Sequence, residues 1–127
     1  MAIAYIVDED EEAALFLRSQ LIDIGYFEQV KRIADSESFS ILLVNESAIV
    51  FVNFDMPLIK GALLYLMLIQ NNIPFICMTK TRDAYKLAFG LDAFDCLFLP
   101  YRTSRLLETV QKYSLYQKSL SVTLSGR

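Results

Sequence analysis

Short apolar runs alternate with longer amphipathic segments, and this alternation predicts the order of secondary structure along the chain. Five apolar runs of about five residues have the composition of buried strands. They are Ala2–Val7, Val30–Ala34, Ala48–Phe54, Pro74–Met78 and Asp95–Leu99. The segments between and after them have the length, composition or apolar spacing of helices. These are Asp10–Ile24, Asp35–Val44, Gly61–Gln70, Arg82–Leu91 and Thr103 to about Ser119.

Strands that alternate with helices require right-handed crossovers and a parallel sheet covered by helices on both faces. The pattern therefore predicts an α/β fold, a doubly wound five-stranded parallel sheet of the flavodoxin-like type, in a three-layer α/β/α sandwich. We expect the domain to span residues 1–118. Residues 119–127 drift toward Ser/Thr-rich polarity and are expected to form a C-terminal tail or the start of a linker.

Composition narrows the chemistry of this domain. The 127 residues are 54% hydrophobic, which excludes disorder, and they contain no histidine, the commonest general base and metal ligand. The net charge of −3 argues against nucleic-acid binding by this domain. The longest apolar run, Gly61–Ile69, is too short to span a membrane.

The cysteines and the first residues bear on location. Cys77 and Cys96 lie in apolar runs and are expected to be buried thiols in a reducing compartment, with redox sensing as the alternative. The chain opens without a signal-peptide pattern. These features favour the cytoplasm.

In a doubly wound sheet, function lies outside the carboxyl ends of the strands. The residues at those ends are Asp8–Asp10, Asn53, Thr79 and Leu99. In this order they resemble the receiver domain of two-component response regulators, from about Ile3 to Tyr113. The first run ends in V-D-E-D, and N-F-D-M-P-L-I-K-G, which begins at Asn53, is similar to the phosphoacceptor loop of that family.

The resemblance implies a phosphorylation switch and the residues that would perform it. In the family an Asp accepts a phosphoryl group from a phosphohistidine, acidic residues hold Mg²⁺, a Lys and a Ser or Thr bind the phosphoryl oxygens, and an aromatic residue reorients. Asp8 and Glu9 match the acidic pair, Asp55 matches the position whose carbonyl helps bind the metal, and Thr79 matches the hydroxyl. The bland alternatives are that the acids cap a helix and that Thr79 is only a β-branched strand residue.

Three functional positions of the family are replaced. Asn53 falls on the phosphoacceptor, Leu99 on the Lys, and Cys96 on the aromatic switch. An amide carries no charge to attack phosphorus, and a leucine cannot pair with a phosphate. We therefore expect a pseudo-receiver that is no enzyme and requires no cofactor, with Asp8, Glu9 and Asp55 as a weakened Mg²⁺ site.

The segment after Gly61 is apolar all round before Gln70. A surface helix should have a polar stripe, so some of its side chains are expected to contact a partner, unless neighbouring segments cover them. The candidates for this contact are Tyr65, Leu66, Leu68 and Ile69.

The expected partners are proteins: a histidine-kinase-type protein, an output domain, or a second copy in a homodimer. The alternative functions are a phosphorylated receiver that uses Mg²⁺, and a small α/β ligand-binding domain that uses the crevice at the strand ends.

Overall fold

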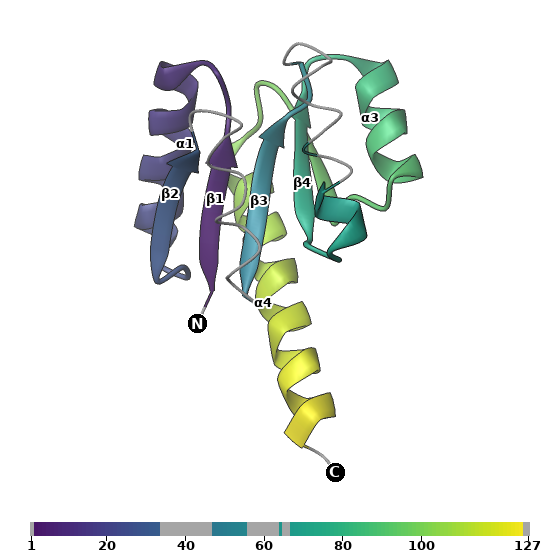
Figure 1. Ribbon diagram of the computed structural model, residues 1–127. Helices are drawn as coiled ribbons and strands as arrows, with labels where there is room; N and C mark the ends of the chain where they lie inside the picture. The colour runs from purple at the N-terminus through teal and green to yellow at the C-terminus, as the bar shows by residue number, and fades with distance from the viewer. Residues whose placement is uncertain (1, 34–46, 56–63, 65–66, 126–127) are drawn as a thin grey trace.

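The computed structural model describes residues 2–33, 47–55, 64 and 67–125. Its centre is a parallel sheet of five strands in the order β2-β1-β3-β4-β5 (Figure 1). The strands are β1 (Ile3–Val7), β2 (Gln29–Ile33), β3 (Ala48–Asn53), β4 (Phe75–Thr79) and β5 (Asp95–Phe98). The predicted five-stranded parallel sheet is confirmed, and each strand bound lies within one residue of the sequence prediction.

The helices begin and end at local signals in the sequence. Helix α1 (Glu11–Ile24) starts where the Asp10 carboxylate accepts from the Ala13 N–H at 3.1 Å. It ends at Gly25, whose φ of 77° is the left-handed conformation that glycine adopts without a Cβ penalty. Helix α3 (Arg82–Gly90) is capped by the Thr81 hydroxyl, which accepts from the Ala84 N–H at 3.2 Å.

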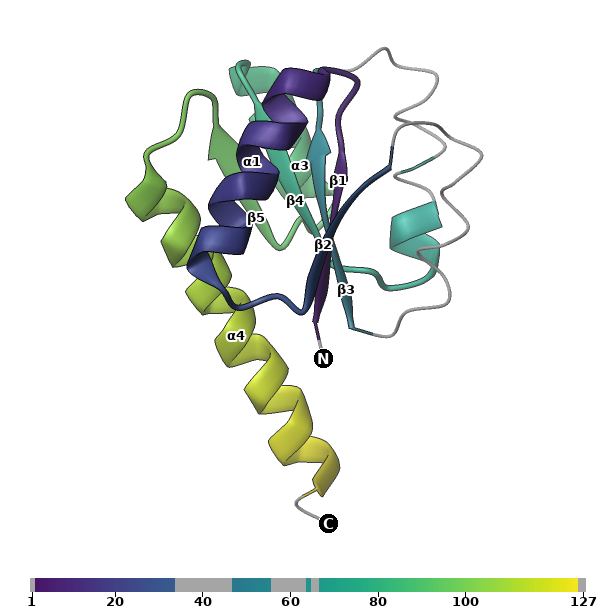
Figure 2. The same cartoon turned by 90° about the vertical axis from the view of Figure 1, so that its left-hand side faces the viewer.

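The two faces of the sheet carry separate hydrophobic cores. Alternate residues of β1 point to opposite sides: Ala4 and Ile6 pack with α1 and α4 (Thr103–Ser125). Tyr5 and Val7 pack on the other face with Leu64 and Leu68. Figure 2 shows α1 and α4 together on one side of the sheet, away from the helical turn at residues 67–70. The helices thus cover both faces, as a doubly wound fold requires.

Two of the expected helices lie wholly or partly outside the described residues. Asp35–Val44 lies outside the described residues. Of Gly61–Gln70, only Leu64 and residues 67–70 are described, and they are helical. The last helix is longer than predicted, because α4 continues to Ser125 instead of ending near Ser119. Its last turns project beyond the edge of the sheet (Figure 2). The Ser/Thr-rich stretch contains no glycine or proline before Gly126 that would stop the helix.

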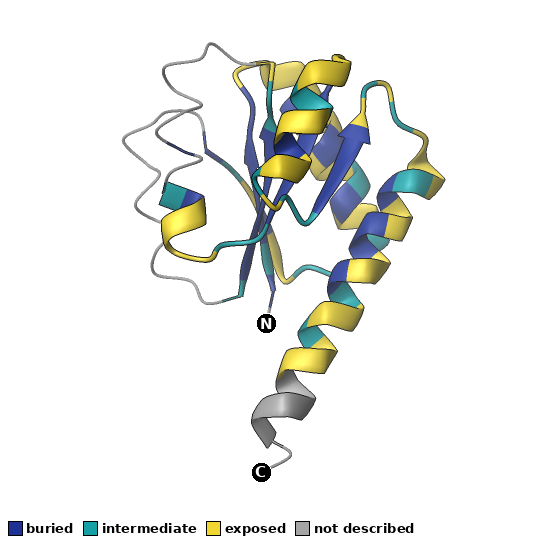
Figure 3. Cartoon of the chain, turned by 90° about the vertical axis from the view of Figure 1, so that its right-hand side faces the viewer, coloured by how far each residue is buried: buried dark blue, intermediate teal, exposed yellow. Residues whose placement is uncertain are grey.

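The burial pattern follows this layering. Strands β3 and β4 are almost wholly buried, whereas α4 has buried positions only up to Tyr113 and is intermediate or exposed from Ser114 to Leu120 (Figure 3). Among the residues that the structure describes, none of the helices has both the length and the apolar composition needed to cross a membrane.

Candidate functional site

The carboxyl ends of four strands bring the predicted site residues to one edge of the sheet. Asp8 follows β1 directly, Asn53 ends β3 and Thr79 ends β4. Leu99 follows β5, and its N–H still donates to the Thr79 carbonyl at 2.9 Å. The register explains this convergence, because Val7 pairs with Val52 and Met78 pairs with both Asn53 and Leu97.

Asn53 is held by two hydrogen bonds that fix the orientation of its amide. Its Oδ1 accepts from the Asp55 N–H at 2.8 Å, so its Nδ2 faces Asp8 and donates to Asp8 Oδ1 at 3.1 Å. The same Asp8 oxygen accepts from the Asp10 N–H at 2.9 Å. Asn53, which the family resemblance places at the phosphoacceptor position, thus bridges β1 and the loop after β3 through its neutral amide.

Asp55 turns its carboxylate toward the end of β4. Its Oδ1 accepts from the Thr79 hydroxyl at 2.5 Å, and its Oδ2 accepts from the Lys80 N–H at 2.9 Å. Thr79 Oγ1 also accepts from the Thr81 N–H at 3.0 Å. A single line of hydrogen bonds thus runs from the loop after β3 through Thr79 to the residue that caps α3. The resemblance indicated only the backbone carbonyl of Asp55, and the side-chain contact with Thr79 was not foreseen.

The donor set at this edge does not fit a Mg²⁺ ion. A divalent cation of this kind needs several oxygen ligands with negative charge. Asn53 brings a neutral amide in place of a third carboxylate, and its Nδ2 donates to Asp8 Oδ1 at 3.1 Å, where a cation would need an oxygen. Glu9 is exposed. Within the described ranges, no group of three or more acidic or cysteine side chains is arranged to hold a metal ion.

Leu99 borders a cavity of about 420 Å³ at the same edge. Its peptide bond to Pro100 is cis. The Tyr101 hydroxyl donates to Gln20 Oε1 of α1 at 2.6 Å, which ties the loop after β5 to the helix that forms the opposite wall. Burial raises the pKa of Tyr101 to about 12, so this hydroxyl remains a donor at neutral pH.

Cys96 and Cys77 are paired neighbours on β5 and β4, and both are buried free thiols. They pack with Ala88 of α3 on the sheet face opposite α1. The contact with the Cys96 thiol, together with burial, raises the pKa of Cys77. The same contact lowers the pKa of Cys96. Both thiols are nearly inaccessible to solvent, at 0% and 2% exposure, so they pack as core residues. Nothing aromatic stands at Cys96 to reorient.

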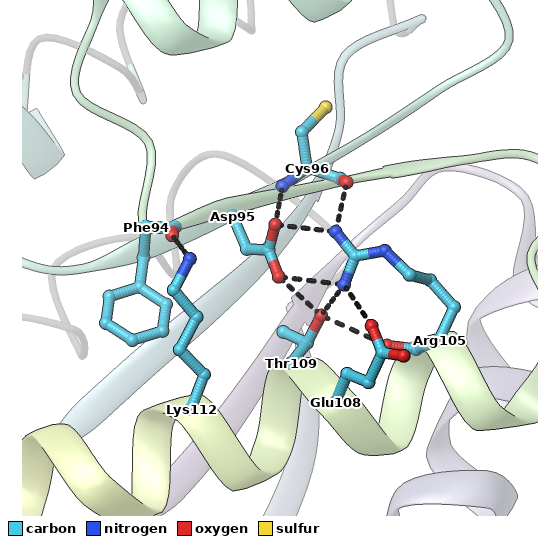
Figure 4. A network of polar contacts seen from close by, with 7 residues as sticks. All are labelled: Phe94, Asp95, Cys96, Arg105, Glu108, Thr109 and Lys112. Carbon is cyan, nitrogen blue, oxygen red and sulfur yellow. Dashed lines mark hydrogen bonds and ion pairs between the residues drawn. The ribbon is translucent and has the colours of Figure 1, made fainter.

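A polar network fixes α4 to β5 and thereby positions the loop that contains Leu99 (Figure 4). Arg105 donates to both oxygens of Asp95, with Nη2 at 2.7 Å from Oδ1 and Nη1 at 3.0 Å from Oδ2. The Thr109 hydroxyl donates to Asp95 Oδ2 at 2.7 Å. Although burial opposes ionisation, the hydrogen bonds from Arg105 and Thr109 lower the pKa of Asp95. The network was not foreseen from the sequence, although Asp95 stands out as a charged residue inside an apolar run.

The four predicted partner-contact residues divide into three groups. Tyr65 and Leu66 lie outside the described residues. Leu68 is 0% exposed and belongs to the core beneath its helix, so the expectation that it contacts a partner is wrong. Ile69 is 41% exposed and is the only described member of the four that reaches the surface. An all-apolar segment does not reveal which of its sides faces the sheet, and packing decided it.

Two further residues contact the site from elements that the sequence did not connect to it. Arg32 of β2 donates through Nη2 to the Asp8 carbonyl at 2.9 Å and to the Glu9 carbonyl at 3.4 Å, and so fixes the turn after β1. Lys80 joins the site through its backbone N–H. Neither Arg32 nor Lys80 belongs to a recognisable sequence motif. Both contacts form because neighbouring strands bring distant residues together.

The chain is similar in sequence to response regulatory proteins and in fold to response-regulator receiver domains. No family model matches the chain. It is 31% identical over 114 residues to an uncharacterized response regulatory protein of Vibrio cholerae, covering 88% of this chain and 48% of that protein. A response regulatory protein of Vibrio parahaemolyticus is 30% identical over 133 residues, covering 99% of this chain and 54% of the relative. The chain thus spans about half the length of the curated relatives that it matches.

Solved structures show the same fold. A response regulator receiver domain of Clostridium thermocellum superposes with a TM-score of 0.80 at 20% identity, over 94% of this chain and 99% of that one. The fold is therefore the flavodoxin-like fold of receiver domains.

Proposed function

We propose that this chain is a receiver domain that works without phosphorylation and transmits its signal through contacts with other proteins. The support comes from the chemistry at the strand ends. Asn53 offers an amide in place of a nucleophilic carboxylate, and Leu99 offers no cation to a phosphoryl group. We further propose that it has no enzymatic activity and needs no Mg²⁺, because the donor set around Asp8 does not fit that ion.

One observation carries this proposal. In the family, the hydroxyl at the position of Thr79 responds to a phosphoryl group by donating a hydrogen bond to it. Here that hydroxyl already donates to an anion of the chain itself, the Asp55 carboxylate at 2.5 Å. The carboxylate takes a second donor, the Lys80 N–H at 2.9 Å. Asp55 therefore supplies the hydrogen-bond acceptor that a phosphoryl group would supply to Thr79.

The consequence reaches the first turn of α3. Thr79 Oγ1 accepts from the Thr81 N–H, and the Thr81 hydroxyl caps the helix. With Asp55 as a permanent acceptor, the loop between β4 and α3 has one arrangement whether or not a phosphodonor is present. The domain would then present a constant surface, and its regulation would come from the partners that bind it.

The proposed partners are a histidine-kinase-type protein, an output domain or a second copy of the chain. The described surface includes exposed apolar side chains suited to such contacts, among them Ile69 and Phe98, which are 41% and 44% exposed. We place the domain in the cytoplasm, because Cys77 and Cys96 are unpaired and a reducing compartment keeps thiols in that state.

The test is phosphorylation by a small donor. The purified chain is incubated with acetyl phosphate and Mg²⁺, and the intact protein is weighed by mass spectrometry. We expect no phosphoryl adduct. The matched control is the variant Asn53→Asp/Asp55→Asn, which returns a carboxylate to the phosphoacceptor position and removes the internal anion; we expect this variant to gain one adduct, located at position 53.

Two results would contradict the proposal. A stoichiometric adduct on the native chain, mapped to Asp8, Glu9 or Asp55, would show a working phosphoacceptor. Loss of the Thr79 hydrogen bond without any effect on α3 would remove the proposed route to the surface. The second result is measured with Asp55→Asn, by comparing backbone amide chemical shifts of Thr81 and Ala84 with those of the native chain.

A further inference from the structure

The cavity beside Leu99 lies at the edge of the sheet formed by the strand ends. It opens between α1 and the loop after β5, above β1, β3 and β4. In sheets of this order, the crevice where the strand order reverses, between β1 and β3, is the usual ligand position. Its volume of about 420 Å³ is within the range of small-molecule sites. Its lining includes Asp8, Phe16, Met78, Lys80, Leu99 and Tyr101.

Asp8 supplies the polar group of this cavity. It is only 5% exposed, and its Oδ1 accepts from Asn53 and Asp10. Its Oδ2 has no hydrogen-bond partner within the part of the chain that the structure describes, and no ion pair there neutralises the carboxylate. Among the described residues, no sealed side-chain oxygen or nitrogen lacks a hydrogen-bond partner, and Asp8 lines the cavity, so this oxygen opens onto the cavity. It can there accept a hydrogen bond from a ligand that brings a positive donor.

The walls around this carboxylate are apolar. Leu99 stands where the family has a lysine, and Met78 and Leu17 are buried beside it. Phe16 is 62% exposed and lines the cavity at its opening. Lys80 borders the cavity from an exposed position. Two acids, Asp8 and Asp10, line the cavity against this one exposed lysine, so the cavity favours a cation over phosphates and carboxylates.

We propose that this cavity binds a small organic cation with an aromatic or branched aliphatic body, such as an arylalkylamine. The ammonium group donates to Asp8 Oδ2, and the body lies between Phe16 and Leu99. This inference goes beyond the proposed function and does not depend on it, because it concerns a ligand and not the phosphorylation state. The replacement of lysine by Leu99 removes a cation from the site and leaves room for one that comes from solution.

The experiment compares three probes of the same shape and different charge. Phenethylamine, 2-phenylethanol and phenylacetate are titrated separately into the native chain, and backbone amide shifts are followed by NMR. We expect saturable shifts with phenethylamine at residues around the cavity, including Leu99 and Tyr101. The Kd for phenethylamine should be at least about tenfold lower than for the other two, the difference expected for a charge-assisted hydrogen bond.

Two variants test the residues assigned. Asp8→Asn keeps the shape of the side chain and an oxygen for Asn53 to bond, and it should raise the Kd of phenethylamine about tenfold or more. Leu99→Lys should abolish binding, because its ammonium group fills the site. Asp23→Asn, an exposed acid of α1, is the matched control and should leave the Kd unchanged.

The inference is overturned if phenethylamine produces no saturable shifts at the cavity, if phenylacetate binds as tightly, or if Asp8→Asn binds phenethylamine as well as the native chain does. None of these results bears on the phosphorylation test, which is read as an adduct mass, so the two proposals fail separately.

Discussion

Replacing Arg105 by alanine tests whether the polar network between β5 and α4 holds the domain together. The guanidinium donates two hydrogen bonds to the Asp95 carboxylate, at 2.7 and 3.0 Å, and one to the Cys96 carbonyl at 3.2 Å. After the change, Asp95 keeps only neutral donors, the Thr109 hydroxyl at 2.7 Å and the Cys96 N–H at 2.8 Å. A nearly buried carboxylate then loses its only counter-charge in the described network.

The expected cost follows from the burial of the two partners. Breaking a fully buried ion pair costs about 3–5 kcal/mol. The Asp95 side chain is 7% exposed but that of Arg105 is 37% exposed, so water replaces part of the lost interaction. We therefore expect the free energy of unfolding to fall by about 2 kcal/mol, which lowers the Tm of a domain of this size by about 8 °C. The contact with Glu108 at 3.9 Å involves an exposed carboxylate and adds little.

The pH dependence has a defined sign. The pKa of Asp95 is lowered in the folded state, because the hydrogen bonds from Arg105 and Thr109 outweigh the opposing effect of burial. A group of this kind stabilises the fold above its unfolded pKa, and that stabilisation is lost as the pH falls through its folded pKa. The difference between the native chain and Arg105→Ala should therefore be greatest near neutral pH and should shrink as the solution becomes more acidic than the ordinary pKa of aspartate.

The assay is urea denaturation, followed by circular dichroism, at several values between neutral and acidic pH. Arg102→Ala is the matched control, since Arg102 is an exposed arginine just before α4; it should change stability by less than about 0.5 kcal/mol. The reasoning is refuted if Arg105→Ala is as stable as Arg102→Ala at neutral pH, or if its deficit does not decrease in acid.

Two further predictions concern packing and backbone conformation, and both are read by the same denaturation assay. Leu68→Ala should cost about 2–5 kcal/mol, because Leu68 is fully buried, whereas Ile69→Ala at the exposed neighbouring position should cost less than about 1 kcal/mol; equal losses would contradict the assignment of Leu68 to the core. Gly25→Ala should destabilise by about 1 kcal/mol, because its φ of 77° strains any residue with a Cβ, even though the nearest atom lies 4.0 Å away. Gly90→Ala meets no atom within 4 Å and has no such φ, so it should be neutral or stabilising, and the opposite order of the two glycine variants would disprove the argument.

The strands were predictable because parallel sheets bury both faces of their inner strands. Such strands read as continuous apolar runs, as Ala48–Asn53 and Phe75–Thr79 do, and their alternation with helical segments leaves few topologies. The ends of α1 were also predictable, since Asp10 and Gly25 are local capping signals. The end of α4 was not, because polarity alone does not stop a helix and the projecting turns carry no breaker before Gly126.

The site was predictable only in part. The resemblance to receiver domains implied that Asn53 and Leu99 stand where the family has a carboxylate and a lysine. It could not indicate that the Asp55 side chain bonds to Thr79, 24 residues away, because that contact depends on the register of β3 against β4 and on the direction of one side chain. The hydrogen bond from Arg32 to the Asp8 carbonyl likewise depends on the pairing of β1 with β2.

The sequence by itself determined the order of strands and helices and the parallel sheet, and its resemblance to receiver domains implied the replacements at Asn53 and Leu99. The order and the sheet follow from local composition and from a topology that leaves one edge for function. Only the tertiary structure decided that Asp55 supplies the anion for Thr79, that Leu68 is core, and that Asp8 faces a cavity beside Leu99. The physical reason is that hydrogen bonds and cavities depend on which distant side chains meet, and strand register and packing decide that.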